Sequence, residues 1–237
     1  MLHIKNITKT YKTDLGRTTA LHDVSLSVYP GELVALIGPS GCGKSTLLRI
    51  IAGLDSDYRG TVDMAYKRTS FVFQHFALMP HMTVYENVAF GLKMQGKKEK
   101  AYTQMINSLL HEVGLQDHGH EFPRNLSGGM RQRVGIARAL AMDPDLLLMD
   151  EPFSALDEFT ADKLRELLLQ IWEKRKITVV LVTHLVREAL KLADRIVVMT
   201  PSPGKIEKIL ANTLKRPRNL RSAEFYRWED ELMELIH

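Results

Sequence analysis

The 237-residue sequence predicts an α/β fold, built on a parallel β-sheet that helices cover on both faces. Three short stretches that each contain an unbroken apolar run support this prediction, at residues 32–38, 145–150 and 178–184, because strands of a parallel sheet are buried on both sides. Helical stretches separate most of these strands, and a longer helical block at residues 83–118 interrupts the alternation. We therefore expect one folding unit over residues 2–235.

Before the helical block, the pattern predicts several strands and one helix. Alternating apolar and polar residues predict two strands of a half-exposed sheet, around residues 4–7 and 21–28. The run ELVALIG at 32–38 predicts a buried strand that a glycine ends, and TLLRIIAGL at 46–54 predicts the helix that follows. Two short strands, TVDM and TSFVF, joined by a polar turn, are expected within residues 60–74.

After the helical block, strands and helices alternate to the end of the chain. The strands are expected at residues 145–150, 178–184 and 195–200, and the helices at about 159–176, 185–194 and 222–236. The helical subdomain, including a helix after residue 127, is expected to span about residues 83–142 as an insertion in the sheet.

The composition limits the kind of protein. Its 32 basic and 28 acidic residues give a net charge of +4, with basic clusters at 97–100 and 215–221 that are either solvated or face an anionic neighbour such as a membrane surface or nucleic acid. The single cysteine excludes an internal disulfide, which fits a reducing cytosol. The polar start MLHIKNITKTYK is not a signal peptide, and no apolar run approaches the roughly 20 residues of a membrane span. Any role at a membrane is therefore expected to be peripheral.

The stretch GPSGCGKS at residues 38–45 matches the phosphate-binding loop pattern G-x-x-x-x-G-K-[ST], between a predicted strand and a predicted helix. Glycines let consecutive backbone N–H groups converge on phosphate oxygens, and the helix N-terminus adds a partial positive charge. Lys44 would reach the β- and γ-phosphates, and Ser45 would offer its hydroxyl to Mg²⁺. A glycine turn that matches by chance is the alternative. The expected nucleotide contacts are Gly38, Pro39, Ser40, Gly41, Cys42, Gly43, Lys44, Ser45 and Thr46.

Two carboxylates, Asp150 and Glu151, end the apolar run LLLMDEP. They are expected at the carboxyl end of a buried strand, where ligands bind in open α/β sheets. Asp150 is suited to hold Mg²⁺ directly or through water, and Glu151 is suited to orient or deprotonate an attacking water. The alternative is that the pair only caps the start of a helix.

The stretch LSGGMRQRVGIARAL at residues 126–140 predicts a second phosphate site. Ser127 is a good helix N-cap, Gly128 and Gly129 expose backbone N–H groups, and the helix that follows directs its positive end at an anion. A chain with one complete phosphate loop hardly needs a second on itself. We therefore expect this site to close on the γ-phosphate held by a neighbouring subunit.

Together these motifs resemble the nucleotide-binding subunit of ABC transporters. LSGGMRQR, the phosphate loop, DEPFSALD at 150–157, Gln74 and His184 follow the order of that family, over roughly residues 2–235. The resemblance implies a RecA-like P-loop NTPase core, a small antiparallel β subdomain and the inserted α-helical subdomain. It also implies ATP and Mg²⁺ as cofactors, and two copies that hold ATP between the phosphate loop of one and the LSGG of the other.

The resemblance assigns roles to residues that the pattern alone does not. Tyr11 matches the aromatic residue that stacks on adenine, although it could be an ordinary strand tyrosine. Gln74 matches the glutamine that contacts Mg²⁺ and the water, and His184 matches the histidine that contacts the γ-phosphate; a lone histidine at a strand end is otherwise structural. Residues 154–157 match a loop that crosses the dimer interface. The implied catalytic residues are Glu151, His184, Gln74 and Lys44, and the implied metal ligands are Ser45, Gln74 and Asp150.

Three positions depart from the family pattern. Leu185 stands where the family often has Asp after the histidine, and Gly135 lies in the predicted signature helix where alanine is common, at a cost of about 1 kcal/mol. The turn between TVDM and TSFVF is short, which predicts a small antiparallel subdomain.

The resemblance also points to a type of transporter. The stretch at residues 77–96, with Met79 and Met82, resembles the importer region that receives a short helix from the membrane permease, although methionine in a helical block is often plain core. The last third of the chain resembles the nitrate, sulfonate and taurine importer branch, which includes thiamine-precursor uptake. These features imply a peripheral subunit on the cytoplasmic face of the membrane, with a permease partner and indirect dependence on a solute-binding protein. The alternatives are an exporter subunit and a soluble ABC ATPase that acts on nucleic acid or the ribosome; the chain has no heptad run of the kind such ATPases carry, and no nucleic acid partner is expected.

Overall fold

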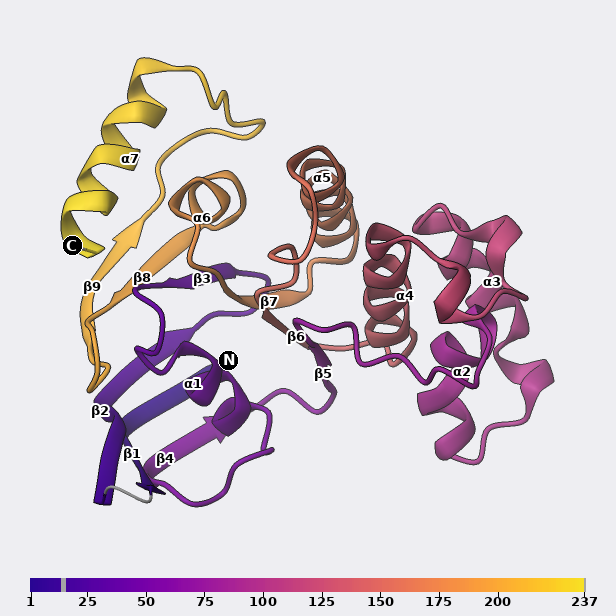
Figure 1. The fold of residues 1–237 in the computed structure, drawn as a ribbon, viewed down its shortest axis with the longest axis horizontal. Helices are drawn as coiled ribbons and strands as arrows, with labels where there is room; N and C mark the ends of the chain where they lie inside the picture. Colours follow the sequence, from indigo (N-terminus) through magenta and orange to yellow (C-terminus); the bar gives the residue numbers. More distant parts are fainter. Residues whose placement is uncertain (14–15, 237) are drawn as a thin grey trace. The chain divides into compact units, whose positions relative to one another are not determined.

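The computed structural model describes residues 1–13 and 16–236 and divides them between two compact units. The first unit comprises Met1–Lys67 and Lys176–His237, and the second comprises Arg68–Arg175. Figure 1 shows the elements of both. Among the described residues, no helix is both long enough and apolar enough to cross a membrane.

An antiparallel sheet opens the first unit. Strand β1 (Leu2–Thr13) lies between β2 (Gly16–Val28) and β4 (Arg59–Met64) and pairs antiparallel with both. The apolar residues that alternate in the sequence lie on the buried face, as the two predicted strands require: Leu2, Ile4, Ile7, Leu21, Val24, Leu26 and Val28. The predicted N-terminal strands are therefore confirmed.

A second sheet in the first unit has the order β7-β3-β8-β9. The strands are β7 (Thr178–Val182), β3 (Leu33–Ile37), β8 (Arg195–Met199) and β9 (Ile206–Ala211). Strand β3 is parallel to β7 and β8, and every residue of β3 and β7 is buried, as their apolar runs predict. The sequence did not predict β9, which pairs antiparallel with β8 and keeps no residue fully buried.

Helices cover both faces of this sheet (Figure 1). Helix α6 (Val186–Leu192) packs on β3 and α7 (Ala223–Ile236) packs on β8, while α1 (Lys44–Ile51) contacts β7 and β2 on the other face. All three helices were predicted, although α1 ends before the stretch AGL, where Gly53 adopts a left-handed φ of 71°.

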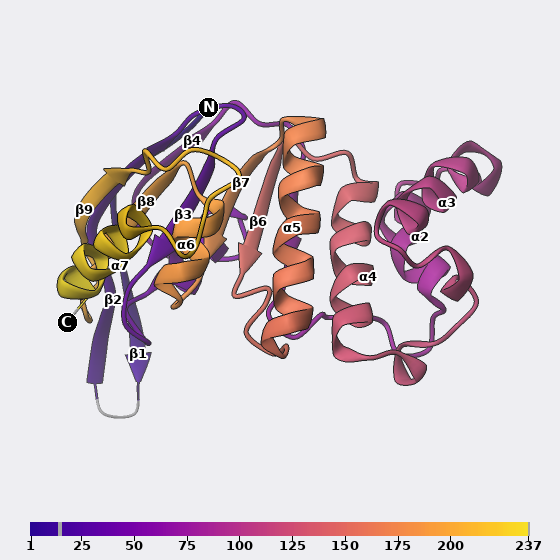
Figure 2. The same ribbon diagram turned by 90° about the horizontal axis from the view of Figure 1, so that it is seen from above.

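The second unit is mostly helical. Its two strands, β5 (Thr69–Val72) and β6 (Leu146–Asp150), pair in parallel. Helix α4 (Gly128–Ala141) lies between α5 (Glu158–Arg175) on one side and α2 (Val84–Met94) and α3 (Thr103–Glu112) on the other (Figure 2). Short 3-10 turns at Glu99–Ala101, Gln116–His118 and Pro123–Asn125 connect these helices. The predicted helical subdomain, residues 83–142, lies inside this unit.

The short turn after β4 does not form a hairpin. TVDM forms part of β4 and pairs with β1, whereas TSFVF contributes β5 and pairs with β6. Both strands were predicted, but they belong to different sheets, so the size of the antiparallel sheet depends on the long strands β1 and β2 rather than on this turn.

Helix α2 begins with a capping box, in which Thr83 Oγ1 accepts the N–H of Glu86 and the Glu86 carboxylate accepts the N–H of Thr83. Asn87, on the same helix, is fully buried. Its amide accepts the N–H of Met79 and donates to the carbonyls of Met79, Met82 and Thr83. One buried amide therefore holds the segment before α2 in place.

Gly135 lies in the interior of α4, where replacement by alanine is expected to raise stability. A Cβ there would meet only the Phe76 carbonyl oxygen, at an ordinary contact distance of 3.7 Å. We expect Gly135→Ala to increase the free energy of unfolding by about 0.5–1 kcal/mol, measured by urea denaturation. Gly91→Ala in α2 is the matched control, since its Cβ would lie 2.4 Å from Met142 Sδ and the gain would be offset. Equal gains at both positions would contradict the argument.

Candidate functional site

The predicted phosphate loop follows β3 directly and ends where α1 begins at Lys44. Gly41 and Gly43 adopt left-handed φ values of 78° and 93°. A Cβ on Gly43 would lie 2.6 Å from a methyl of Leu21, and one on Gly38 would lie 2.6 Å from the Met199 carbonyl oxygen. The loop therefore requires glycine for its conformation and for its close approach to β2 and β8.

Lys44 is buried within this loop. Its ammonium donates to the carbonyl oxygens of Gly38 at 2.8 Å and Pro39 at 2.9 Å, and lies 3.6 Å from Cys42 Sγ. The Cys42 side chain is fully buried. The loop thus holds a positive charge beside the converging backbone N–H groups at the start of α1, which suits a phosphate chain.

Strand register brings His184 to the same edge of the sheet as the phosphate loop. Leu36 of β3 pairs with Val182 of β7, so Gly38 and His184 each lie two residues beyond the pair. His184 is exposed, and Leu185 is the N-cap of α6 without a side-chain cap bond. With leucine instead of aspartate at 185, α6 therefore lacks a side-chain cap.

Tyr11 lies on β1 and belongs to a polar cluster with Lys9 and Asp55. The Tyr11 hydroxyl lies 3.3 Å from Asp55 Oδ2 and 3.4 Å from Thr46 Oγ1, at the end of the phosphate loop. The Lys9 ammonium lies 4.8 Å from the centre of the Tyr11 ring. These contacts fix the orientation of the ring and connect it to the loop.

Lys9 is almost fully buried, and its charge is balanced locally. Its ammonium donates to Asp55 Oδ1 at 2.8 Å and to the Asp57 carbonyl at 2.6 Å. The hydrogen bond from Lys9 lowers the pKa of the Asp55 carboxyl, against a smaller opposing effect of burial. Burial alone would lower the pKa of Lys9, but its carboxylate partners raise it above the ordinary value.

In the second unit, register also aligns Gln74 with Glu151. Val72 of β5 pairs with Met149 of β6, so Gln74 and Glu151 each lie two positions beyond the pair. Gln74 Nε2 donates to Glu151 Oε2 at 3.2 Å and to Ser154 Oγ at 3.4 Å. Asp150 ends β6 and is buried, while Glu151 adopts a left-handed φ of 43°. The two carboxylates and the amide thus lie together at the carboxyl end of the strand pair.

The LSGG segment begins α4. Ser127 is the N-cap and accepts the N–H of Met130 at 3.2 Å, which confirms the predicted helix start. A Cβ on Gly129 would lie 2.4 Å from Thr160 Cγ2 at the start of α5, and the N–H of Thr160 is held by Asp157 at 3.0 Å. The LSGG segment and the end of the 154–157 loop therefore lie close together at helix N-termini.

Three features of the site were missed at the level of sequence. One is the Lys9–Asp55 pair, and another is Gly204, where a Cβ would lie 1.9 Å from the Cys42 carbonyl oxygen. The third is Arg138 on α4, which donates to the carbonyls of Phe76 and Ala77, just after Gln74. Burial lowers the pKa of Arg138. The turn residues PSPG were a local signal for a close approach near Gly204, but nothing local indicated the other two.

Comparison with known proteins agrees with this geometry. The family model described as ABC transporter matches residues 21–154. An aliphatic sulfonates import ATP-binding protein of Pseudomonas syringae pv. tomato is 48% identical, over 92% of this chain and 92% of its own, and a protein of the same name from Bacillus subtilis is 44% identical, over 92% and 87%. An uncharacterized ABC transporter ATP-binding protein of Methanocaldococcus jannaschii is 44% identical, over 99% of this chain and 91% of its own.

Solved structures show the same fold. A dimeric ATP-binding cassette in a post-hydrolysis state, bound to ADP and Pi, superposes with a TM-score of 0.80 at 35% identity, covering 90% of this chain and 99% of the other. The protein therefore belongs to the ABC transporter family. Within that family, the chain is the ATPase subunit, with the P-loop NTPase fold that the sequence predicted.

Replacing Asp55 by asparagine is expected to destabilise the chain, because the buried Lys9 ammonium loses its main counter-charge. We expect a loss of about 1–3 kcal/mol in the free energy of unfolding at pH 7, measured by urea denaturation. The folded-state pKa of Asp55 is depressed, so this contribution is present above its ordinary value of about 3.9 and is lost as the pH falls through the lower folded-state pKa.

The matched control is Asp57→Asn. The Asp57 carboxylate is 94% exposed and lies 3.4 Å from Lys9, so its removal should change stability little. A loss at Asp57 as large as that at Asp55, or a wild-type advantage that persists unchanged at pH 3, would contradict the assignment.

Proposed function

We propose that the chain hydrolyses ATP to power an importer of aliphatic sulfonates. The observation that carries this proposal is the 48% identity to a sulfonate import subunit over 92% of both chains. Other subunits of that name, from Bacillus species, are 41–45% identical. Within the nitrate, sulfonate and taurine branch that the sequence indicates, these relatives favour sulfonates.

The phosphate loop fits ATP. Gly38 and Gly43 let the loop pack against β8 and β2, and Lys44 adds the charge that the β- and γ-phosphates need. Among the described residues, no cluster of three His, Cys, Asp or Glu side chains could hold a metal ion by itself. The remaining donors, Ser45, Asp150 and the Gln74 amide, are the oxygen ligands that suit Mg²⁺ bound together with ATP phosphates. When bound, Mg²⁺ neutralises charge that develops on the phosphates.

The catalytic roles follow from the two strand pairs. Glu151, hydrogen-bonded to Gln74, would orient and accept a proton from the attacking water, and His184 would contact the γ-phosphate. Tyr11 would stack on the adenine. Ser127, Gly128 and Gly129 would contact the γ-phosphate held by a second copy of the chain, because they lie at the positive end of a 14-residue helix.

A permease would dock on the second unit, beside α2. A cavity of about 150 Å³ lies there, with the lining residues Met82, Tyr85, Glu86, Ala89, Phe90, Lys93, Glu99 and Tyr102. Asn87 holds the preceding segment to α2. We place the subunit on the cytoplasmic face of the membrane, with the solute-binding protein acting through the permease. An exporter would use the same surface, so the direction of transport depends on the relatives alone.

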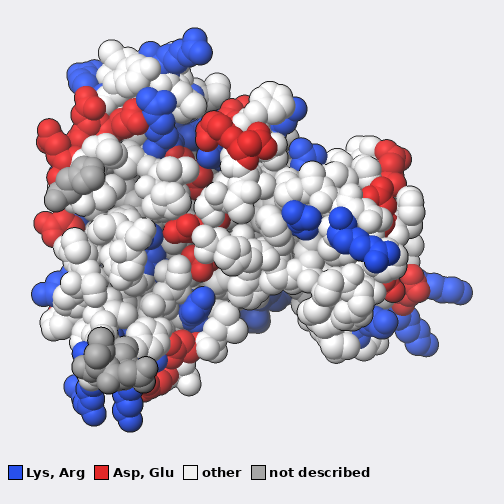
Figure 3. Space-filling view, in the orientation of Figure 1, with Lys and Arg blue, Asp and Glu red and all other residues white. Residues whose placement is uncertain are grey.

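Action on nucleic acid is the weaker alternative. On the face shown in Figure 3, acidic and basic side chains are interspersed. Proteins that bind nucleic acid through its phosphates gather lysine and arginine on one surface. The chain's small net charge of +4 agrees with the transport proposal.

Two substitutions separate ATP binding from hydrolysis. Glu151→Gln should abolish hydrolysis while retaining ATP, and should accumulate as a dimer with Mg-ATP, because the sandwiched nucleotide is not consumed. Lys44→Ala should weaken ATP binding itself, by about tenfold or more. Size-exclusion chromatography and nucleotide titration measure both effects. A wholly monomeric Glu151→Gln protein in Mg-ATP would count against the sandwich.

The transport proposal is tested in the assembled complex with its permease and solute-binding protein. ATP hydrolysis should rise severalfold with an alkanesulfonate and remain unchanged with nitrate, whereas the isolated chain should respond to neither. Met82→Asp should abolish co-purification with the permease and retain ATP binding, because it places a charge beside the apolar side chains Ala89 and Phe90 that line the cavity. Met94→Asp is the matched control, since Met94 is the last residue of α2, is 66% exposed and does not line the cavity. Stimulation by nitrate instead of sulfonate would overturn the choice of solute.

A further inference from the structure

A second cavity in the second unit has no part in the site described above. Its volume is about 440 Å³, within the range of small-molecule sites of roughly 300–1,000 Å³. Arg68, which precedes β5, and Asp143, which precedes β6, both line it. Because β5 and β6 are parallel, this is the amino end of the strand pair, and Gln74 and Glu151 lie beyond its carboxyl end.

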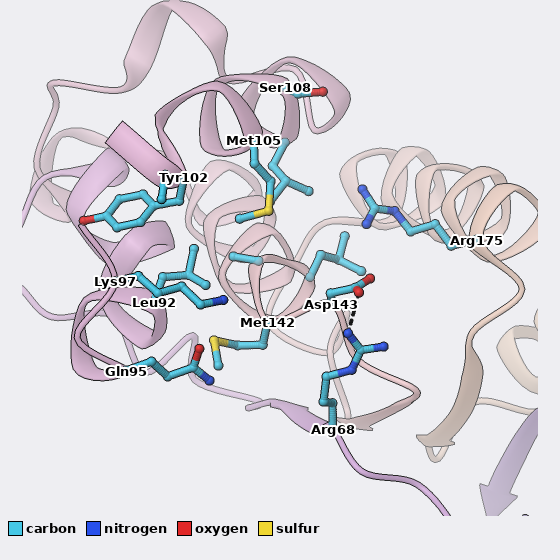
Figure 4. Close-up of a pocket in the computed structure, with 14 residues that line it drawn as sticks. Arg68, Leu92, Gln95, Lys97, Tyr102, Met105, Ser108, Met142, Asp143 and Arg175 are labelled. Atoms are coloured by element: carbon cyan, nitrogen blue, oxygen red, sulfur yellow. Dashed lines mark hydrogen bonds and ion pairs between the residues drawn. The ribbon is translucent and has the colours of Figure 1, made fainter. Parts of the chain in front are cut away.

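The floor of the cavity is apolar. Leu92, Tyr102, Leu109 and Leu140 are buried along one part of it, and the methionines lie nearer the surface. Figure 4 shows Met105 and Met142 on either side of the space. Unbranched methionine side chains adapt to an alkyl chain of variable length.

The rim carries three cations and one carboxylate. Arg68 already forms ion pairs with two carboxylates, Asp143 at 2.6 Å and Asp145 at 2.8 Å. Arg175 and Lys97 extend toward the space from opposite sides in Figure 4. These two side chains are therefore the ones available to a ligand.

Arg175 and Lys97 both retain hydrogen-bond donors. One Arg175 nitrogen pairs with Glu112 at 2.5 Å, but its Nε is buried and has no hydrogen-bond partner. Burial alone would raise the pKa of Glu112, but the hydrogen bond and charge of Arg175 hold it below its ordinary value. The Glu112 carboxylate is therefore ionised and stays paired with Arg175. Within residues 1–13 and 16–236, no hydrogen bond or ion pair engages the Lys97 ammonium.

We propose that this cavity binds a short aliphatic anion, with a sulfonate or carboxylate head between Lys97 and Arg175 and its alkyl chain on the apolar floor between Met105 and Met142. Oxygens of the head would accept hydrogen bonds from the exposed Lys97 ammonium and lie beside the Arg175 guanidinium, and an ionised acceptor makes the stronger kind of hydrogen bond. The alkyl chain would bury apolar surface that water otherwise contacts. The site is independent of the proposed ATP hydrolysis.

The test is calorimetric titration of the purified chain, without nucleotide, with butanesulfonate, hexanesulfonate, hexanoate and hexylammonium. We expect saturable binding of the anions, an affinity that rises roughly fourfold for each added CH₂ that is buried, and no binding of the cation. Similar affinities for hexanesulfonate and hexanoate would assign the site to aliphatic anions in general, and preference for the sulfonate would assign it to the proposed transport solute. Absence of saturable binding, or equal binding of hexylammonium, would overturn the proposal.

Variants locate the binding. Lys97→Ala and Arg175→Gln should each weaken hexanesulfonate binding about tenfold or more, whereas Lys98→Ala, at an adjacent exposed lysine outside the cavity, should not. Met105→Ser should weaken binding and Met94→Ser should not. Lys97 and Met105 are exposed, so their variants keep the test valid if Arg175→Gln fails to fold.

A final arm separates this cavity from the phosphate loop, which is itself an anion site. The affinity for hexanesulfonate should be unchanged by saturating ATP and by Lys44→Ala. Competition with ATP, or equal affinities in Lys97→Ala and Lys98→Ala, would show that the anion binds elsewhere and would refute the assignment.

Discussion

The register between parallel strands is the constraint on which the site depends. In each unit, one strand pair sets two polar segments side by side: the phosphate loop beside His184, and Gln74 beside Glu151. A shift of one residue would reverse which face of the sheet each side chain points to. Complete burial of β3, β6 and β7 prevents such a shift, because every position is buried and nearly all are apolar. The packing of the core therefore also sets the positions of the site residues.

Two buried lysines in the first unit are stabilised in different ways. The ammonium of Lys9 is paired with carboxylates, which neutralise its charge and fix its position. Lys44 is held by carbonyl oxygens of Gly38 and Pro39, which solvate an ammonium without neutralising it. The first arrangement supports an aromatic ring, and the second leaves a net positive charge at a helix N-terminus. Burial alone therefore does not distinguish a structural lysine from a functional one, whereas the nature of its acceptors does.

The parts of the fold that the sequence predicted are those with a local physical cause. Unbroken apolar runs predicted β3, β6 and β7, and glycine spacing predicted the phosphate loop. Strand β9 was missed because an edge strand with exposed side chains has no apolar run. The Lys9–Asp55 pair spans 46 residues, and the approach of Gly204 to Cys42 spans a larger separation. Such contacts follow from strand order, which no local pattern contains.

The hydrogen bonds from Arg138 to the carbonyls of residues 76 and 77 stabilise a strained segment of backbone. Phe76 and Ala77 adopt successive left-handed φ values of 56° and 47°, which cost non-glycine residues about 1–2 kcal/mol each. The guanidinium bonds to both carbonyls, and the ring of Phe76 under Arg131, offset that strain. The segment after Gln74 is therefore held in a strained conformation by Arg138 of α4, the helix that Ser127 caps. A movement of α4 that withdrew Arg138 would let the backbone relax, and Gln74 would move with it.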